Sequence, residues 1–156
     1  MKSEIKAKKK VKIKRVGGYK GDLPRYISPG SSGLDLTAFI KGQGGEMIIG
    51  PGKIELVPTG IAVSIPEGFE GQVRPRSGLA LKYGVTLVNT PGTIDSDYRG
   101  EIKAILINHG EAPYVVKNGD RIAQLVIAKV ERIAWEETKE LPDTERGEGG
   151  FGSTGD

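Results

Sequence analysis

Cysteine is missing from this sequence of 156 residues, and histidine occurs once, as His109. Without cysteine there are no disulfides, no thiolate catalysis and no zinc sites built on cysteine. A single histidine disfavours a histidine-rich metal site and a Ser-His-Asp triad, so oxygen ligands would have to hold any metal, with magnesium the leading candidate. No apolar run approaches the ~20 residues of a membrane span, and the N-terminus lacks a signal peptide's apolar segment. We therefore expect a cytoplasmic protein without a membrane partner.

Positive charge is concentrated at the N-terminus. Residues 1–15 carry eight basic side chains against one acidic residue, Glu4, whereas the remainder carries 15 basic and 19 acidic residues. A basic arm could contact nucleic acid. Because no aromatic residues lie between the lysines, we interpret residues 1–10 as a solvated basic arm that leads into an edge strand, and we expect no specific nucleic-acid partner.

Short apolar, β-branched segments separated by glycine- and proline-containing turns predict one all-β domain over residues 11–140, a sandwich, barrel or jelly roll. The expected strands cover residues 11–16, 34–40, 47–49, 54–57, 61–65, 71–74, 85–88, 101–108, 114–116, 121–130 and 133–137. One short helix is predicted near residues 77–83, with Ser77 as its N-cap and Gly84 just past its end. Residues 141–156 are polar and glycine-rich, which predicts a flexible tail.

Two segments combine turn residues with reactive side chains. At the predicted helix start, Arg76 could contact a phosphate while Gly78 lets a ligand approach free backbone N–H groups; alternatively, the serine only caps the helix. The segment 89–102 is predicted to form a hairpin whose tip exposes backbone groups, with Asp95 as a candidate general base and Tyr98 as a surface for a sugar. The alternative is ordinary turn chemistry with a core tyrosine.

Two further segments carry polar residues with open alternatives. Gln124 interrupts an apolar strand and needs a partner if it is buried, which could be a phosphate or a neighbouring subunit, unless that face is exposed. In the tail, Phe151 could stack on a base and Arg146 could hold phosphate, unless the tail has no structure. The glycine-rich run 149–155 has no lysine and no following helix, so it is not a Walker A motif.

Five segments, in this order, resemble the motifs of the homotrimeric dUTP pyrophosphatase (dUTPase) family: SSGLDLTA at 31–38, PRSGLA at 75–80, GTIDSDYRGEI at 92–102, GDRIAQLVI at 119–127 and RGEGGFGSTG at 146–155. The resemblance covers nearly the whole chain except the N-terminal arm. It implies a distorted jelly roll of the β-clip type and a homotrimer with active sites shared between subunits. It also implies magnesium-dependent hydrolysis of dUTP to dUMP and pyrophosphate, which keeps uracil out of DNA and supplies dUMP for thymidylate synthesis.

The resemblance also implies a role for individual residues. The catalytic set would be Asp95, which orients or deprotonates a water attacking the α-phosphorus, together with Arg76 and Gln124. The base and sugar would contact Asn89, Gly92, Thr93, Ile94 and Tyr98, and the ring of Tyr98 would leave no room for a 2′-hydroxyl. The phosphates would contact Arg76, Ser77, Gly78 and Gln124, and Lys103 lies where some members also touch substrate. The tail lid would consist of Arg146, Phe151, Gly152, Ser153 and Thr154. No residue is expected to bind the metal directly, although Asp35 could hold a metal-bound water.

Two other functions remain open from the sequence. One is a dCTP deaminase-like or bifunctional enzyme of the same fold. Two features disfavour it: the third motif with Tyr98, and the intact glycine-rich fifth motif. The other is a non-catalytic trimeric β scaffold with a nucleic-acid-binding arm. That scaffold would not explain why Arg76, Asp95, Tyr98 and the tail motif occur together.

Overall fold

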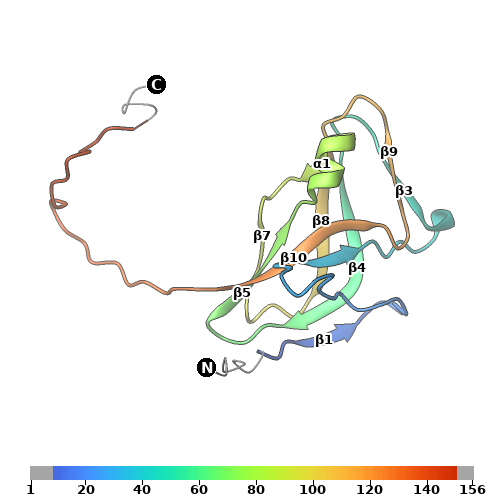
Figure 1. Cartoon of the computed structure of the whole chain (residues 1–156), viewed down its shortest axis with the longest axis horizontal. Helices are drawn as coiled ribbons and strands as arrows, with labels where there is room; N and C mark the ends of the chain where they lie inside the picture. Colours follow the sequence, from blue (N-terminus) through green and yellow to red (C-terminus); the bar gives the residue numbers. More distant parts are fainter. Residues whose placement is uncertain (1–8, 151–156) are drawn as a thin grey trace.

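The computed structural model describes residues 9–150, which fold into a body of β-strands with one short helix (Figure 1). The strands are β1 (Lys12–Arg15), β2 (Leu34–Thr37), β3 (Glu46–Ile49), β4 (Ile54–Ser64), β5 (Phe69–Arg74), β6 (Val85–Leu87), β7 (Gly92–Ile94), β8 (Glu101–Asn108), β9 (Tyr114–Lys117) and β10 (Arg121–Lys129). The helix is α1 (Ser77–Tyr83), and a 3-10 turn, η1, covers Gln43–Gly45. No helix within residues 9–150 is both long and apolar enough to cross a membrane.

Two four-stranded antiparallel sheets make up most of the body. Their strand orders are β1-β4-β8-β6 and β2-β10-β5-β7, and β3 and β9 form a separate two-stranded ribbon. Both sheets contribute fully buried side chains to one hydrophobic cluster, among them Leu36, Ile102, Leu106 and Ile122. The structure therefore confirms the predicted all-β, distorted jelly-roll fold with one short helix.

Strand β8 shows why the sequence pattern locates strands well. Every second side chain along it, from Ile102 to Asn108, is buried, which is the two-residue period of a strand with one face on the core. Strand β4 differs from the prediction, because residues 54–57 and 61–65 were expected to form separate strands. Instead β4 runs continuously to Ser64 and takes up Pro58 and Gly60 in a bulge where its pairing with β8 shifts register.

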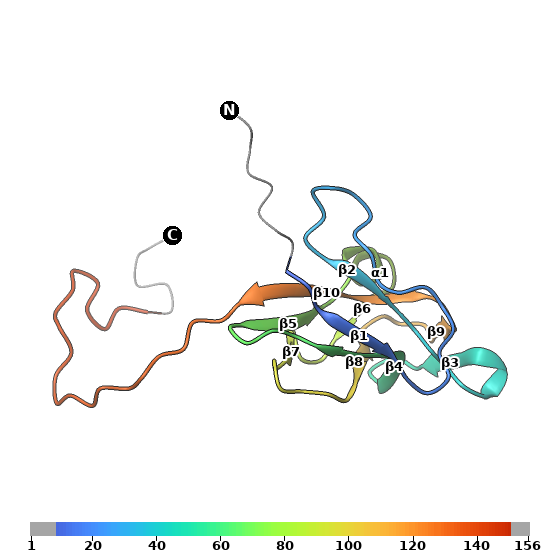
Figure 2. The same ribbon diagram turned by 90° about the horizontal axis from the view of Figure 1, so that it is seen from below.

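The helix and the last predicted strand need correction. Ser77 is the first helical residue rather than the N-cap; Arg76 occupies the cap position, and no side chain caps the helix. Gly84 ends the helix in the left-handed conformation as predicted, with φ of 67°. The strand predicted at 133–137 is wrong: these residues lie in an extended segment that leaves the body after β10 (Figures 1 and 2), and Trp135 is 93% exposed. Alternating apolar residues form a strand only where a partner strand is available, and this segment has none among residues 9–150.

Asn108 holds together the end of the body that carries α1. Its buried side chain donates from Nδ2 to the carbonyls of Ile49 (2.9 Å) and Ala112 (2.8 Å) and accepts from the N–H of Gly110 (2.8 Å). The next residue along the chain, His109, donates its N–H to the carbonyl of Gly84 at the end of α1. The buried amide thus fixes the turn after β8, and this turn is bonded to the end of α1 through His109 and Gly84.

We expect Asn108→Ala to lower the free energy of unfolding by about 2–4 kcal/mol, because it leaves buried backbone groups without partners. Urea denaturation measures the change. The matched control is Asn118→Ala, which removes a single bond to the N–H of Ile40 from an exposed side chain and should cost about 0.5–1.5 kcal/mol. Equal losses in the two variants would contradict this account of Asn108.

Candidate active site

The chain between β6 and β8 crosses from one sheet to the other. β6 and β8 are neighbours in the first sheet, but β7 between them pairs with β5 in the second, with Gly92 opposite Val73 and Ile94 opposite Gly71. The Thr90–Pro91 peptide bond, just before β7, is cis. The segment is therefore not the simple hairpin predicted from the sequence, because its flanking strands pair in the first sheet while β7 pairs in the second.

Strand β7 is an edge strand. It is the last strand in the order β2-β10-β5-β7, so only one of its sides is paired within the described chain. Gly92 is buried, and a Cβ placed on it would lie 3.0 Å from Nδ2 of Asn89. The amide of Asn89 thus lies against the start of an open strand edge, where backbone N–H and C=O groups are free to bind a ligand.

A pocket of about 400 Å³ lies beside β7 and contains five of the predicted site residues. It is lined by Leu56, Thr93, Ile94, Asp95, Tyr98, Glu101, Lys103 and Ile105. The side chains of Asp95 and Tyr98 are exposed within it, while Ile94 is half-buried. The pocket therefore combines an apolar wall, an aromatic ring, two carboxylates and an ammonium group.

Asp95 lies at the start of a turn that is braced by hydrogen bonds. Its carbonyl accepts the N–H of Tyr98 (3.1 Å), and the Arg99 guanidinium donates to the carbonyls of Ser96 (2.7 Å) and Tyr98 (2.9 Å). The carboxylate of Asp95 takes no part in these bonds, and Asp95 lines the pocket. The turn thus fixes the backbone on which a candidate general base is carried.

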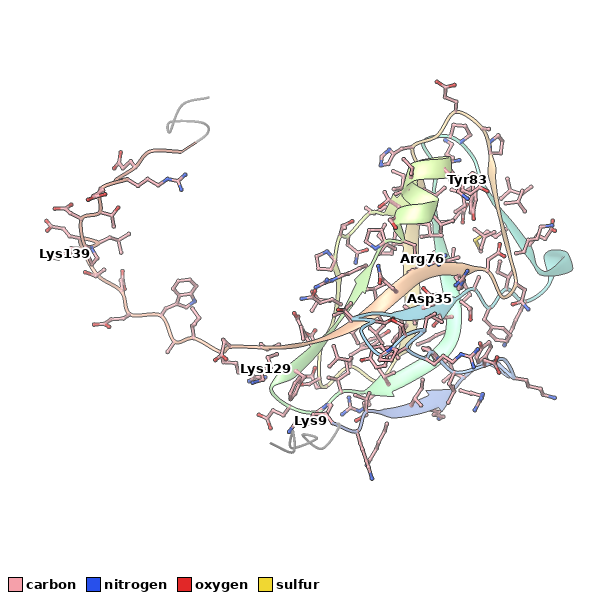
Figure 3. The ribbon with its side chains drawn as sticks, viewed as in Figure 1. Lys9, Asp35, Arg76, Tyr83, Lys129 and Lys139 are labelled. Carbon is pink, nitrogen blue, oxygen red and sulfur yellow. The ribbon has the colours of Figure 1, made fainter. Side chains whose placement is uncertain are left out.

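A second group of predicted residues surrounds Asp35. Its carboxylate accepts from Nε of Arg76 (3.0 Å) and from Nη1 of Arg121 (3.2 Å), and Arg76 also donates to the carbonyl of Arg121 (3.1 Å). Figure 3 shows Arg76 and Asp35 side by side beneath α1. The side chains of Arg76 and Asp35 are only 26% and 21% exposed. Two guanidinium groups share one carboxylate, so the group keeps a net positive charge and can attract an anion.

Ser77 and Gly78 form the first turn of α1, directly after Arg76, and both are exposed. Backbone N–H groups in the first turn of a helix have no partner within the helix. A Cβ placed on Gly78 would meet nothing within 4 Å, so the approach to these groups is open. Arg76, Ser77 and Gly78 thus lie together at the start of α1, and their role in binding phosphate stays a prediction.

Tyr114 packs beside the same group. Its ring lies 5.0 Å from that of Tyr83 at the end of α1. Burial raises the pKa of the Tyr114 phenol, the charge of Asp120 and the neighbouring Tyr83 raise it further, and the Arg76 guanidinium opposes them. The phenol therefore stays neutral beside the arginine.

Gln124 is half-buried and already has a partner. Its Nε2 donates to the carbonyl of Pro75 (3.0 Å), directly before Arg76, and the residue lies opposite Asp35 across β10 and β2. A Cβ placed on Gly33 would lie only 2.3 Å from Oε1 of Gln124. Gly33 therefore leaves the space that the amide occupies. This role was not predicted from the sequence, although a glycine just before a predicted strand can indicate the close approach of another group.

The described chain does not bring all predicted residues into one site. Arg76 and Gln124 do not line the pocket that contains Asp95. Arg146 lies in the segment that runs away from the body and donates to the carbonyl of Gly149 (2.8 Å) (Figure 1). Phe151, Gly152, Ser153 and Thr154 lie outside the described residues, as does most of the basic arm. Within residues 9–150, no three histidine or acidic side chains gather as a metal site.

Comparison with known proteins gives consistent matches. The sequence model of the family described as dUTPase matches residues 19–155. The deoxyuridine 5'-triphosphate nucleotidohydrolase of Syntrophotalea carbinolica is 59% identical over 145 residues, which cover 93% of this chain and 96% of that protein. The solved structure of the dUTPase of Staphylococcus bacteriophage 80alpha with dUPNHPP has a TM-score of 0.82 at 24% identity, covering 95% and 99% of the two chains. A variant dUTPase of phage phi11 of S. aureus, described as coordinating a structural Mg(II) ion, has a TM-score of 0.74 at 20% identity, covering 85% and 98%.

We expect Gly33→Ala to push the Gln124 amide off the carbonyl of Pro75, because the new Cβ and Oε1 cannot occupy the same space. The side-chain amide resonances of Gln124 should shift in an NMR spectrum. The free energy of unfolding should fall by about 0.5–1.5 kcal/mol, the contribution of one hydrogen bond. Gly30→Ala is the matched control, since a Cβ there meets nothing within 4 Å. Unchanged Gln124 resonances in Gly33→Ala would show that the glycine is not needed for this arrangement.

Proposed function

Since the chain belongs to the dUTPase family, we propose that it hydrolyses dUTP to dUMP and pyrophosphate by attack of water on the α-phosphorus. The observation that carries this proposal is the pocket beside β7, which combines Asp95, Tyr98 and the open edge of residues 92–94. The comparisons do not favour a dCTP deaminase or a non-catalytic scaffold.

The open edge of β7 is suited to reading a nucleobase. Backbone N–H and C=O groups of Gly92, Thr93 and Ile94 present donors and acceptors in a fixed order, and the Asn89 amide adds one of each. Uracil and cytosine differ in donor and acceptor polarity at their pairing edge, so a fixed backbone pattern accepts one and rejects the other. In this proposal Thr93 contributes its backbone groups rather than its side chain.

Asp95 and Tyr98 act on the sugar and the attacking water. The ring of Tyr98 packs against the deoxyribose and leaves no room for a 2′-hydroxyl. The carboxylate of Asp95 bonds the 3′-hydroxyl and orients or deprotonates the water. A carboxylate fulfils this role when it has hydrogen-bond reach first and a suitable pKa second. Lys103, in the same pocket, is the candidate further contact to substrate, and its ammonium group lies 4.0 Å from the carboxylate of Glu101.

The phosphate chain is held by Arg76, Ser77, Gly78 and Gln124 of a neighbouring subunit. Their separation from the Asp95 pocket within one chain supports a site shared between subunits of a homotrimer. Apolar side chains on the outside of the body support such an assembly as well: Ile48, Ile54 and Leu56 are each more than half exposed. Asp35 keeps Arg76 in place and thereby keeps positive charge directed at the phosphates.

Magnesium ion is the proposed cofactor, and the donor set fits an ion that arrives with the nucleotide. Mg²⁺ keeps several waters and uses few protein ligands when phosphates are available. Asp35 would hold it through a water rather than directly. When bound, the ion neutralises negative charge on the phosphates.

The tail closes the site in this proposal. Residues 141–156 would form a lid in which Phe151 stacks on uracil, and Arg146, Gly152, Ser153 and Thr154 grip the phosphates. The course of the chain after β10, away from its own body, supports contact with another subunit (Figure 2). The cytoplasmic location and the basic arm without a specific nucleic-acid partner stay predictions from the sequence.

We expect Asp95→Asn to bind nucleotide but to turn over dUTP about 10²–10⁴-fold more slowly, because an amide cannot accept the proton of the water. Pyrophosphate release from dUTP with magnesium measures turnover, and calorimetry with a non-hydrolysable analogue measures binding. Asp97→Asn is the matched control, since this exposed carboxylate lies in the same turn and does not line the pocket beside β7.

Near-normal turnover in Asp95→Asn would remove Asp95 from its role. Release of ammonia from dCTP by the unmodified protein, without pyrophosphate from dUTP, would instead establish the deaminase alternative.

Ending the chain after Thr144 should leave the trimer intact and abolish most dUTP hydrolysis, because the lid is lost while the body is unchanged. Light scattering gives the mass in solution, and pyrophosphate release gives the activity. A fully active truncated protein would show that the tail is dispensable, and a monomeric one would show that the tail is needed for assembly instead.

A further inference from the structure

Two tyrosines in this chain fold onto glycines in the same local arrangement. The segments 19–22 (YKGD) and 98–101 (YRGE) share the order aromatic, basic, glycine, acidic. In each, the phenol donates to the carbonyl three residues later: Tyr19 to Asp22 (2.8 Å) and Tyr98 to Glu101 (3.1 Å). The ring lies over the glycine two residues later in both segments.

Gly100 leaves no space for a side chain beneath the ring of Tyr98. A Cβ placed on it would lie 2.3 Å from Oη, 2.5 Å from Cζ and 2.9 Å from Cε2 of Tyr98. Gly100 does not have a positive φ, so the backbone itself would accept alanine. What the position requires is the absence of Cβ, and any larger residue displaces the ring by about 1 Å to restore ordinary contact distances.

The acceptor of the Tyr98 phenol is fixed to the sheet. Glu101 is the first residue of β8, and its Oε1 accepts the N–H of Gly60 (2.8 Å) at the bulge of β4. On the other side, the Arg99 guanidinium holds the carbonyls of Ser96 and Tyr98. The phenol is therefore bonded to the first residue of β8, and the ring lies directly over Gly100.

We propose that Gly100 is a specificity-determining positioning residue: by leaving room for the ring of Tyr98, it holds that ring where it excludes a 2′-hydroxyl. The proposal rests on the proposed function, in which Tyr98 packs against deoxyribose. Gly100 itself touches no substrate. It sets the depth of the sugar pocket through the position of the tyrosine ring, and a displacement of ~1 Å in such a site alters rates strongly.

Gly100→Ala should reduce the preference for dUTP over UTP, taken as the ratio of the two kcat/KM values from pyrophosphate release, by about tenfold or more. Gly21→Ala is the matched control. It creates the same clash with Tyr19, which packs against Phe39 and Thr37 and does not line the pocket beside β7. It should lower the melting temperature at least as much as Gly100→Ala but leave the dUTP/UTP ratio unchanged.

A double-mutant cycle with Tyr98→Ala tests whether Gly100 acts through the ring. Once the ring is gone, Gly100→Ala should have no further effect on the ratio. The proposal is overturned if Gly100→Ala keeps the parent ratio, if Gly21→Ala changes it equally, or if the effects of Gly100→Ala and Tyr98→Ala multiply. If Gly100→Ala alone does not fold, the double variant must fold like Tyr98→Ala, since the clash is removed; its failure to fold would also overturn the proposal.

Failure of the proposed function gives different results. A parent protein that releases no pyrophosphate from dUTP contradicts the proposed reaction. A Tyr98→Ala variant that keeps full selectivity contradicts the assigned role of Tyr98. Loss of selectivity in Tyr98→Ala with an unchanged ratio in Gly100→Ala contradicts the role of Gly100 alone.

Discussion

The crossing of residues 88–100 from one sheet to the other is the constraint on which the candidate site depends. Because β6 and β8 pair in one sheet while β7 pairs with β5 in the other, this segment is tied at three points. Asp95 and Tyr98 follow β7 in this segment, and both line the same pocket. The bond from the N–H of Gly60 to Glu101, which lines the pocket, connects this wall to the bulge of β4.

Local signals in the sequence predicted local structure well. The alternation in β8, the glycine after α1 and the association of Asp95 with Tyr98 all depend on neighbouring residues, and all three are found. The continuity of β4 could not be read from Pro58 and Gly60, which look like a strand break. The carboxylate of Glu101, 41 positions away from Gly60, satisfies the N–H exposed at that bulge. The pairing of β7 with β5 could not be predicted from a local pattern either, because it depends on which strand of the second sheet has a free edge.

The segment at 133–137 shows the opposite case, where a strand-like pattern has no strand. Ile133 and Trp135 have the apolar character of a buried strand but remain exposed, 68% and 93%, in the single chain. The separation of the Asp95 pocket from the Arg76 group is also not evident from composition or periodicity. Only the family resemblance predicted an active site shared between subunits.

The edge position of β7 has a consequence for solubility. Unpaired strand edges recruit other strands and promote aggregation, and proteins limit this by keeping such edges short. β7 contains only three residues, from Gly92 to Ile94. An edge of this length offers enough hydrogen-bonding groups for a small planar ring but too few to nucleate a ladder with another sheet. A longer β7 would offer more groups to a ligand but would also increase the tendency of the protein to self-associate. A bound nucleotide would cover the edge and reduce that tendency.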